Sequence, residues 1–151
     1  MLSIINASAG TGKTYTLVKN YLFEILSKNS NDEFKKLIGL TFTNKAVFEM
    51  KSRIIRTLYY FSKTKDKKQY QSLFLEISKK TNLSTNELEY KSGVILKKIL
   101  HQYSFFEIKT LDKFSLKIIR DFYKDLDIAY NFQVELNSEI ILNKIIKRII
   151  N

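Results

Sequence analysis

A glycine-bearing turn near the N-terminus constrains the fold of this 151-residue chain more than any other stretch. Residues 2–6 are mostly apolar and are predicted to form a strand, and apolar residues recur at helical spacing after the turn. Strand, glycine turn, Lys-Thr pair and helix, in that order, are the context of a phosphate-binding P-loop. We therefore predict a nucleotide-binding segment made of Ala7, Ser8, Ala9, Gly10, Thr11, Gly12, Lys13 and Thr14.

The chemistry of phosphate binding accounts for the residue types in this turn. Gly10 and Gly12 allow backbone conformations that a side chain would block, so successive N–H groups can point at phosphate oxygens. Lys13 can reach the β- and γ-phosphates, and the Thr14 hydroxyl can bind the Mg²⁺ ion that bridges them. The strict pattern begins with glycine, whereas this chain has Ala7, the smallest replacement. The alternative is an ordinary glycine-containing turn between a strand and a helix.

The bulk composition narrows the class of partner and of site. The net charge of +11 favours a polyanion, with nucleic acid ahead of a membrane surface. A lysine- and asparagine-rich chain is also what an AT-rich genome encodes. Without cysteine there is neither a disulfide framework nor a cysteine-based zinc site, and the single His101 argues against a histidine-based one. No apolar run approaches the roughly 20 residues of a membrane span, and no secretion signal is visible. We predict a cytoplasmic protein without a membrane partner.

The periodicity of the first 62 residues alternates between strand and helix. The helix after Lys13 carries one apolar face, made of Leu17, Val18, Tyr21, Leu22 and Ile25. Residues 37–41 form an apolar run without alternation, which predicts a strand covered on both faces. A second amphipathic helix follows from Asn44 to about Ser62, with apolar residues at Val47, Met50, Ile54, Leu58 and Phe61. This order predicts an α/β fold, a parallel sheet with crossover helices.

The rest of the chain is predicted to be mainly helical. Two helices are expected between residues 69 and 101, and the second begins at Ser84, where Ser84 and Glu87 have the spacing of a capping box. Residues 105–109 have strand character and lead into a helix, residues 131–136 suggest a further strand, and a helix runs from Ser138. That last helix carries an apolar stripe that continues to the end of the chain and needs a partner to cover it, so the fold is expected to be incomplete there. The stripe consists of Ile141, Leu142, Ile145, Ile146 and Ile149.

Phe42 is unusual because it is an aromatic residue at the carboxyl end of a predicted parallel strand, where α/β proteins bind ligands. Its ring could stack on a nucleobase, although the residues alone favour packing in the core. Thr43 or Asn44 could cap the helix that follows. In the same way Thr110 or Asp112 occupies the cap position of a later helix.

Three blocks together resemble the UvrD/Rep-type superfamily-one helicases, particularly the RecB- and AddA-like branch. Residues 7–14 resemble motif I of that branch, including the initial alanine. Residues 40–54, with Thr-Phe-Thr-Asn-Lys-Ala, resemble motif Ia, and residues 109–114, followed by Ile119-Arg120, resemble motif Ib. A P-loop alone is shared by many families, but the order and spacing of the three blocks are specific.

The resemblance implies an ATP- and Mg²⁺-dependent translocase on single-stranded DNA that acts in recombination or double-strand break repair. By position, Gly10 to Thr14 contact phosphate, Lys13 stabilises charge on the transferring phosphoryl group, and Thr14 binds the metal. Motif Ia contacts DNA through Thr41, Phe42, Thr43 and Asn44, and motif Ib through Thr110 and Phe114. Many relatives have histidine where this chain has Asp112, and an acidic side chain beside a phosphate is unfavourable. Asp112 is therefore not assigned a DNA contact.

The resemblance also implies how the chain is organised. It predicts a P-loop NTPase (RecA-like) core at residues 1–62 and 104–125, a helical insertion at 63–103, and the start of a further helical subdomain at 126–151. The acidic pair of the Walker B motif, the arginine finger and the second motor domain are missing, so the chain alone is expected to be inactive. Its expected partners are the remainder of a helicase chain and a nuclease/helicase partner subunit.

Two other functions stay open from the residues. One is a small-molecule kinase with a P-loop, which should have an arginine-rich lid, whereas the four arginines here are scattered: Arg53, Arg56, Arg120 and Arg148. The other is a non-catalytic basic module that binds nucleic acid and retains a vestigial P-loop.

Overall fold

The computed structural model describes residues 12–63, 68–129, 131–134 and 138–150. The chain divides into two compact units, Met1–Phe114 and Ser115–Asn151. The predicted strand at residues 2–6 and the first five residues of the predicted nucleotide-binding segment, Ala7 to Thr11, lie outside the described residues. The described part of the chain is mostly helical and contains a small parallel sheet of two strands.

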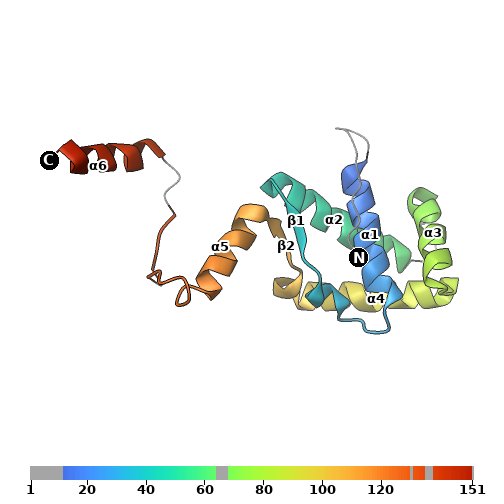
Figure 1. Ribbon diagram of the computed structural model, residues 1–151. Helices are drawn as coiled ribbons and strands as arrows, with labels where there is room; N and C mark the ends of the chain where they lie inside the picture. Colours follow the sequence, from blue (N-terminus) through green and yellow to red (C-terminus); the bar gives the residue numbers. More distant parts are fainter. Residues whose placement is uncertain (1–11, 64–67, 130, 135–137, 151) are drawn as a thin grey trace. The chain divides into compact units, whose positions relative to one another are not determined.

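The described elements follow one another in the order shown in Figure 1. They are α1 (Lys13–Ser27), the short 3₁₀ helix η1 (Glu33–Lys36), β1 (Gly39–Thr41), α2 (Asn44–Phe61), η2 (Lys68–Tyr70), α3 (Gln71–Thr81), α4 (Thr85–His101), η3 (Tyr103–Phe105), β2 (Ile108–Thr110), α5 (Leu111–Asp121) and α6 (Ser138–Ile150). The boundary between the two units falls inside α5.

Side-chain caps determine where three of the helices begin. Thr43 accepts a hydrogen bond from the Ala46 backbone N–H at 3.1 Å, so α2 begins at Asn44, as predicted. Ser84 and Glu87 form the predicted capping box at the start of α4. At the start of α5 the Thr110 hydroxyl oxygen accepts a hydrogen bond from the Lys113 backbone N–H at 3.3 Å. Of the two cap residues considered for α5, the structure uses Thr110.

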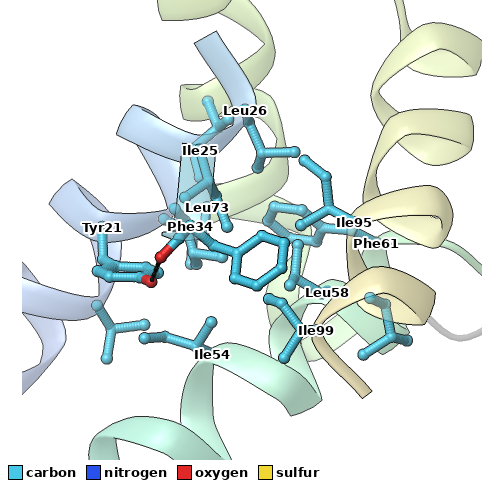
Figure 2. Packing of buried hydrophobic residues seen from close by; sticks show 14 of the residues in the cluster. Tyr21, Ile25, Leu26, Phe34, Ile54, Leu58, Phe61, Leu73, Ile95 and Ile99 are labelled. Atoms are coloured by element: carbon cyan, nitrogen blue, oxygen red, sulfur yellow. Dashed lines mark hydrogen bonds between the residues drawn. The ribbon is translucent and has the colours of Figure 1, made fainter. Parts of the chain in front are cut away.

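The hydrophobic core of the first unit lies between α1, α2, α3 and α4. Figure 2 shows the fully buried ring of Phe34 among side chains from α1, α2, α3 and α4, with the Tyr21 hydroxyl donating a hydrogen bond to the Phe34 carbonyl. The apolar faces predicted for α1 and α2 are largely confirmed. The prediction that Leu17 lies on the apolar face of α1 is wrong, because 47% of this residue is exposed. Leu26, which was not predicted to be on that face, is fully buried.

The sheet pairs β1 with β2 in parallel, with Gly39 opposite Ile108 and Thr41 opposite Thr110. The prediction of a strand at residues 37–41 covered on both faces is wrong for the described structure. Ile38 is 54% and Leu40 39% exposed, because α2 packs on one face of the strand pair, where Gly39 and Ile108 are buried. The parallel pairing itself confirms the predicted direction of the strands, while a complete RecA-like sheet stays a prediction.

Two other predicted strands differ from the structure. The strand expected at residues 105–109 begins only at Ile108, because η3 ends at Phe105 and the Phe106 ring turns into the core. There it meets the rings of Tyr21 and Tyr103 edge to face, each with centroids 5.9 Å away. Of the strand expected at 131–136, residues 131–134 are irregular, and the remainder lies outside the described residues.

The second unit contains the end of α5 and all of α6. The helix predicted from Ser138 is confirmed as α6, and its described apolar side chains, among them Leu142 and Ile149, are exposed. Within the described ranges no helix is both long enough and apolar enough to cross a bilayer.

Candidate nucleotide and nucleic-acid site

At the start of α1, the described residues leave backbone N–H groups that no helical hydrogen bond uses. Gly12 has φ 85° and ψ 22°, a left-handed conformation that glycine adopts without the steric cost a side chain brings. The first helical hydrogen bond runs from the Thr16 N–H to the Gly12 carbonyl at 2.9 Å. The N–H groups of Lys13, Thr14 and Tyr15 therefore have no partner within the helix. They are available to an anion, which the positive end of the helix dipole also favours.

The side chains around this turn fit a phosphate and a bound cation. Gly12 provides no side-chain cap, and the first turn of α1 contains no acidic residue, so no carboxylate competes with an anion there. Lys13 is exposed and Thr14 is partly exposed, which leaves an ammonium group and a hydroxyl accessible at the same helix end. These three described residues of the predicted nucleotide-binding segment therefore suit phosphates and Mg²⁺.

The two predicted DNA-binding blocks meet at one edge of the sheet. Because β1 and β2 are parallel and paired in register, Thr41 and Thr110 end their strands side by side, and each strand leads directly into a helix, α2 or α5. The carboxyl edge of a parallel sheet is where α/β proteins bind ligands. Residues about seventy positions apart in sequence are thus brought into one place.

Phe42 lies between β1 and α2 and is 86% exposed. The interpretation that the residues alone favour, core packing, is therefore wrong. An aromatic ring that gives up so little surface to the protein adds little to the stability of the fold. Its surface is available for stacking on a planar ligand.

A hydrogen bond joins the two blocks directly. The Lys113 ammonium donates to the Asn44 side-chain carbonyl oxygen at 3.0 Å, and both residues are exposed. The oxygen of the Asn44 amide accepts this hydrogen bond, and its NH₂ group can donate to a ligand. Sequence reasoning did not single out Lys113. Its position three residues after a strand end, with Thr110 as the cap, was the signal that could have identified it.

The threonines of this edge mainly fix the backbone. The Thr41 hydroxyl donates to the Thr43 carbonyl at 3.2 Å, and Thr43 caps α2. Thr110 is only 5% exposed and caps α5. Phe114 is half-buried in α5, and the exposed Asp112 stands in the first turn of that helix. Of the predicted DNA-binding residues, Phe42 and Asn44 therefore present the most accessible groups, and direct contacts from Thr110 and Phe114 stay predictions.

Comparisons with known proteins identify the family of this chain. The family model of the UvrD/REP helicase N-terminal domain matches residues 2–151. The A subunit of the ATP-dependent helicase/nuclease of Lachnoclostridium phytofermentans is 30% identical over 141 residues, which are 93% of this chain and 8% of that protein. Proteins of the same description from Lactobacillus acidophilus and Staphylococcus carnosus are 34% and 31% identical over 87% and 93% of this chain.

The chain spans 9% of the length of each of these last two relatives. No solved structure matches it significantly. The family model, in contrast, covers the chain almost from end to end and includes all three motif blocks. The chain belongs to the UvrD/REP helicase N-terminal domain family.

Proposed function

We propose that this chain forms the ATP-binding front end of a DNA helicase or translocase that moves on single-stranded DNA in recombination or double-strand break repair. The observation that carries the proposal is the exposed Phe42 ring at the carboxyl edge of the β1–β2 pair, beside the hydrogen bond from Lys113 to Asn44. The family and the names of the relatives, which are ATP-dependent helicase/nuclease subunits, support it.

At the nucleotide site, the residues of the glycine turn bind and orient the triphosphate. Backbone N–H groups at the start of α1 donate to phosphate oxygens, and the exposed Lys13 ammonium offsets the negative charge of the β- and γ-phosphates. The Thr14 hydroxyl is a ligand for Mg²⁺. Bound MgATP would supply the free energy of hydrolysis that drives movement. Ala7 to Thr11 are proposed to complete the phosphate-binding turn.

At the DNA site, Phe42 stacks on a base, and the neighbouring groups hold the strand backbone. Thr41 and Thr43 use their side chains within the loop, so their contribution to DNA binding is to fix its shape and its backbone N–H groups. The Asn44 amide and the exposed Lys45 and Lys113 ammonium groups are the ones that can donate to phosphates. Thr110 contributes by starting α5, which carries Lys113.

Measuring the affinity of the 151-residue chain for oligothymidylate, with and without MgATP, tests this function. Nucleotide-dependent affinity is expected. An equal affinity for DNA with and without MgATP would favour a basic binding module with a vestigial P-loop. No DNA binding would favour a small-molecule kinase. Lys13→Ala should abolish nucleotide binding and leave the fold intact by circular dichroism.

Phe42→Ala should weaken DNA binding by about 1–3 kcal/mol, the usual contribution of a stacked base. Tyr90→Ala is the matched control, because Tyr90 is a strongly exposed aromatic residue on α4, away from the carboxyl edge. Equal losses from the two variants would contradict the assignment of Phe42.

The whole enzyme needs groups beyond those described above. We propose that the remainder of a helicase chain provides the acidic pair for Mg²⁺ and the arginine finger. We also propose a nuclease/helicase partner protein, because the names of the relatives describe them as one lettered subunit of a helicase/nuclease. On its own, the chain is expected to show no DNA-stimulated ATP turnover.

A further inference from the structure

An open groove of about 500 Å³ runs between α2 and α4. On the α2 side it is lined by Ser52, Ile55 and Tyr59, and Phe48 continues this stripe by one turn toward the start of the helix. Spacings of three and four positions place these residues on one face of α2. None of the lining residues belongs to the glycine turn or to the carboxyl edge of the sheet, so the groove is separate from both sites described above.

The walls of the groove are apolar and largely uncovered. Phe48 is 75%, Leu100 56% and Tyr59 49% exposed, while Leu96 from α4 forms a buried floor. The Tyr59 ring meets the Tyr60 ring edge to face, with centroids 5.6 Å apart, so this wall is already held in place. Soluble proteins rarely leave neighbouring large apolar side chains exposed together unless another molecule covers them. The groove therefore has the character of a contact surface.

The charged groups beside the groove are cationic. Arg56 lines it, and the Lys63 ammonium lies 5.6 Å from the centroid of the Tyr59 ring. None of the lining residues is an aspartate or a glutamate. Cations at the rim of an apolar surface favour a partner with acidic side chains in matching positions, and they disfavour a partner that is basic there.

The shape and the charge together select one kind of occupant. An apolar groove between two packed helices accepts the apolar face of a third helix, whose anchor side chains recur every three or four positions. We propose that this groove docks an amphipathic helix of a partner protein. Its apolar side chains enter between α2 and α4, and the acidic side chains on its flanks face Arg56 and Lys63.

Two other occupants fit these observations less well. A second copy of this chain would place the same surface against itself, so that Arg56 and Lys63 would face their own counterparts. A DNA strand needs flat rings on which its bases can stack, whereas Ile55, Leu96 and Leu100 are aliphatic, and Lys63 lies over the ring of Tyr59.

The affinity of the 151-residue chain for two designed helical peptides tests the proposal by fluorescence anisotropy. Both peptides carry leucine at helical spacing on one face, and the flanking positions are glutamate in one peptide and lysine in the other. Leu100→Ser and Arg56→Gln change the groove. Leu75→Ser on α3 and Arg120→Gln on α5 are the matched controls, because each makes the same change at an exposed position outside the groove. Thermal unfolding by circular dichroism verifies that every variant is folded.

The glutamate peptide is expected to bind at least tenfold more tightly than the lysine peptide. Leu100→Ser should weaken its binding at least fivefold, and Arg56→Gln should reduce the preference for glutamate, whereas both controls should behave like the unchanged chain. Oligothymidylate should not displace the peptide, and Phe42→Ala should not change its affinity, so a failure of the proposed DNA site would leave this result intact.

Four outcomes would overturn the proposal: equal affinity for the two peptides, no binding of the glutamate peptide at millimolar concentration, equal losses in Leu100→Ser and Leu75→Ser, or an unchanged preference in Arg56→Gln. Displacement of the peptide by oligothymidylate would assign the groove to DNA instead. A concentration-dependent dimer in analytical ultracentrifugation that Leu100→Ser abolishes would assign it to a second copy.

Discussion

Replacing Gly39 by alanine tests the packing of β1 against β2 and α2. An added Cβ would lie 3.1 Å from the Cγ1 of Ile108 and 3.4 Å from both the Cγ2 of Ile108 and the Cε of Met50. The Met50 methyl is the end of a flexible side chain and can move, but Ile108 is branched at Cβ and buried. Overpacking of this kind costs about 1–3 kcal/mol. We therefore expect Gly39→Ala to lower the free energy of unfolding by that amount.

Gly93→Ala is the matched control for this substitution. Gly93 is inside α4, and an added Cβ there would meet only the Cβ of Ser62, at an ordinary contact distance of 3.4 Å. Because glycine in a helix interior is about 1 kcal/mol worse than alanine, Gly93→Ala should raise the stability by about that amount. Equilibrium urea unfolding followed by circular dichroism measures both changes. A neutral or stabilising Gly39→Ala would refute the pairing of Gly39 with Ile108.

Three further changes test other parts of the first unit. The Ser92 hydroxyl is buried without a hydrogen-bond partner among the described residues, so Ser92→Ala should stabilise the fold by about 1 kcal/mol in urea unfolding. Ser84→Ala removes the capping box of α4 and should cost about 1 kcal/mol, whereas Ser84→Asp should retain most of the stability. Hydrogen bonds from Lys35 and then Lys98 lower the pKa of the Asp32 carboxyl. Its carboxylate therefore stabilises the folded state above its ordinary pKa, and this contribution is lost as the pH falls through the lowered value. Unfolding measured from pH 6 to pH 2 should accordingly show a shallower loss of stability below about pH 4 in Asp32→Asn than in the unchanged chain; identical profiles would contradict this reasoning.

The features predicted well from the sequence are those that local chemistry determines. The start of α2 at Asn44 and the start of α4 after Ser84 follow from cap side chains within three residues of the helix end. The apolar repeats of α1 and α2 identified most of their buried residues, because helical periodicity places such residues on one face. The left-handed Gly12 before Lys13 likewise agrees with a turn that residue type and order predict.

The errors concern features that depend on distant parts of the chain. The composition of residues 37–41 could not show that only one face of the strand pair would be covered. Phe42 is as apolar as a core residue, and only the direction in which its loop leaves β1 makes it exposed. Lys113 was missed because its hydrogen-bond partner Asn44 is far away in sequence, so that only its position after a strand end could have indicated it. The arginines, although scattered in sequence, include Arg56, which lines the groove between α2 and α4 together with residues distant from it in sequence.

The hydrogen bond between Asn44 and Lys113 spans 69 positions of sequence, and so has a consequence for folding kinetics. Closing so long a segment costs conformational entropy before the contacts at its ends form, and pairings of this kind fold slowly. The helices α2, α3 and α4 can form from local interactions, whereas the edge that presents Phe42 next to Lys113 exists only after β1 and β2 have met. Refolding experiments should therefore recover helical signal before they recover affinity for DNA.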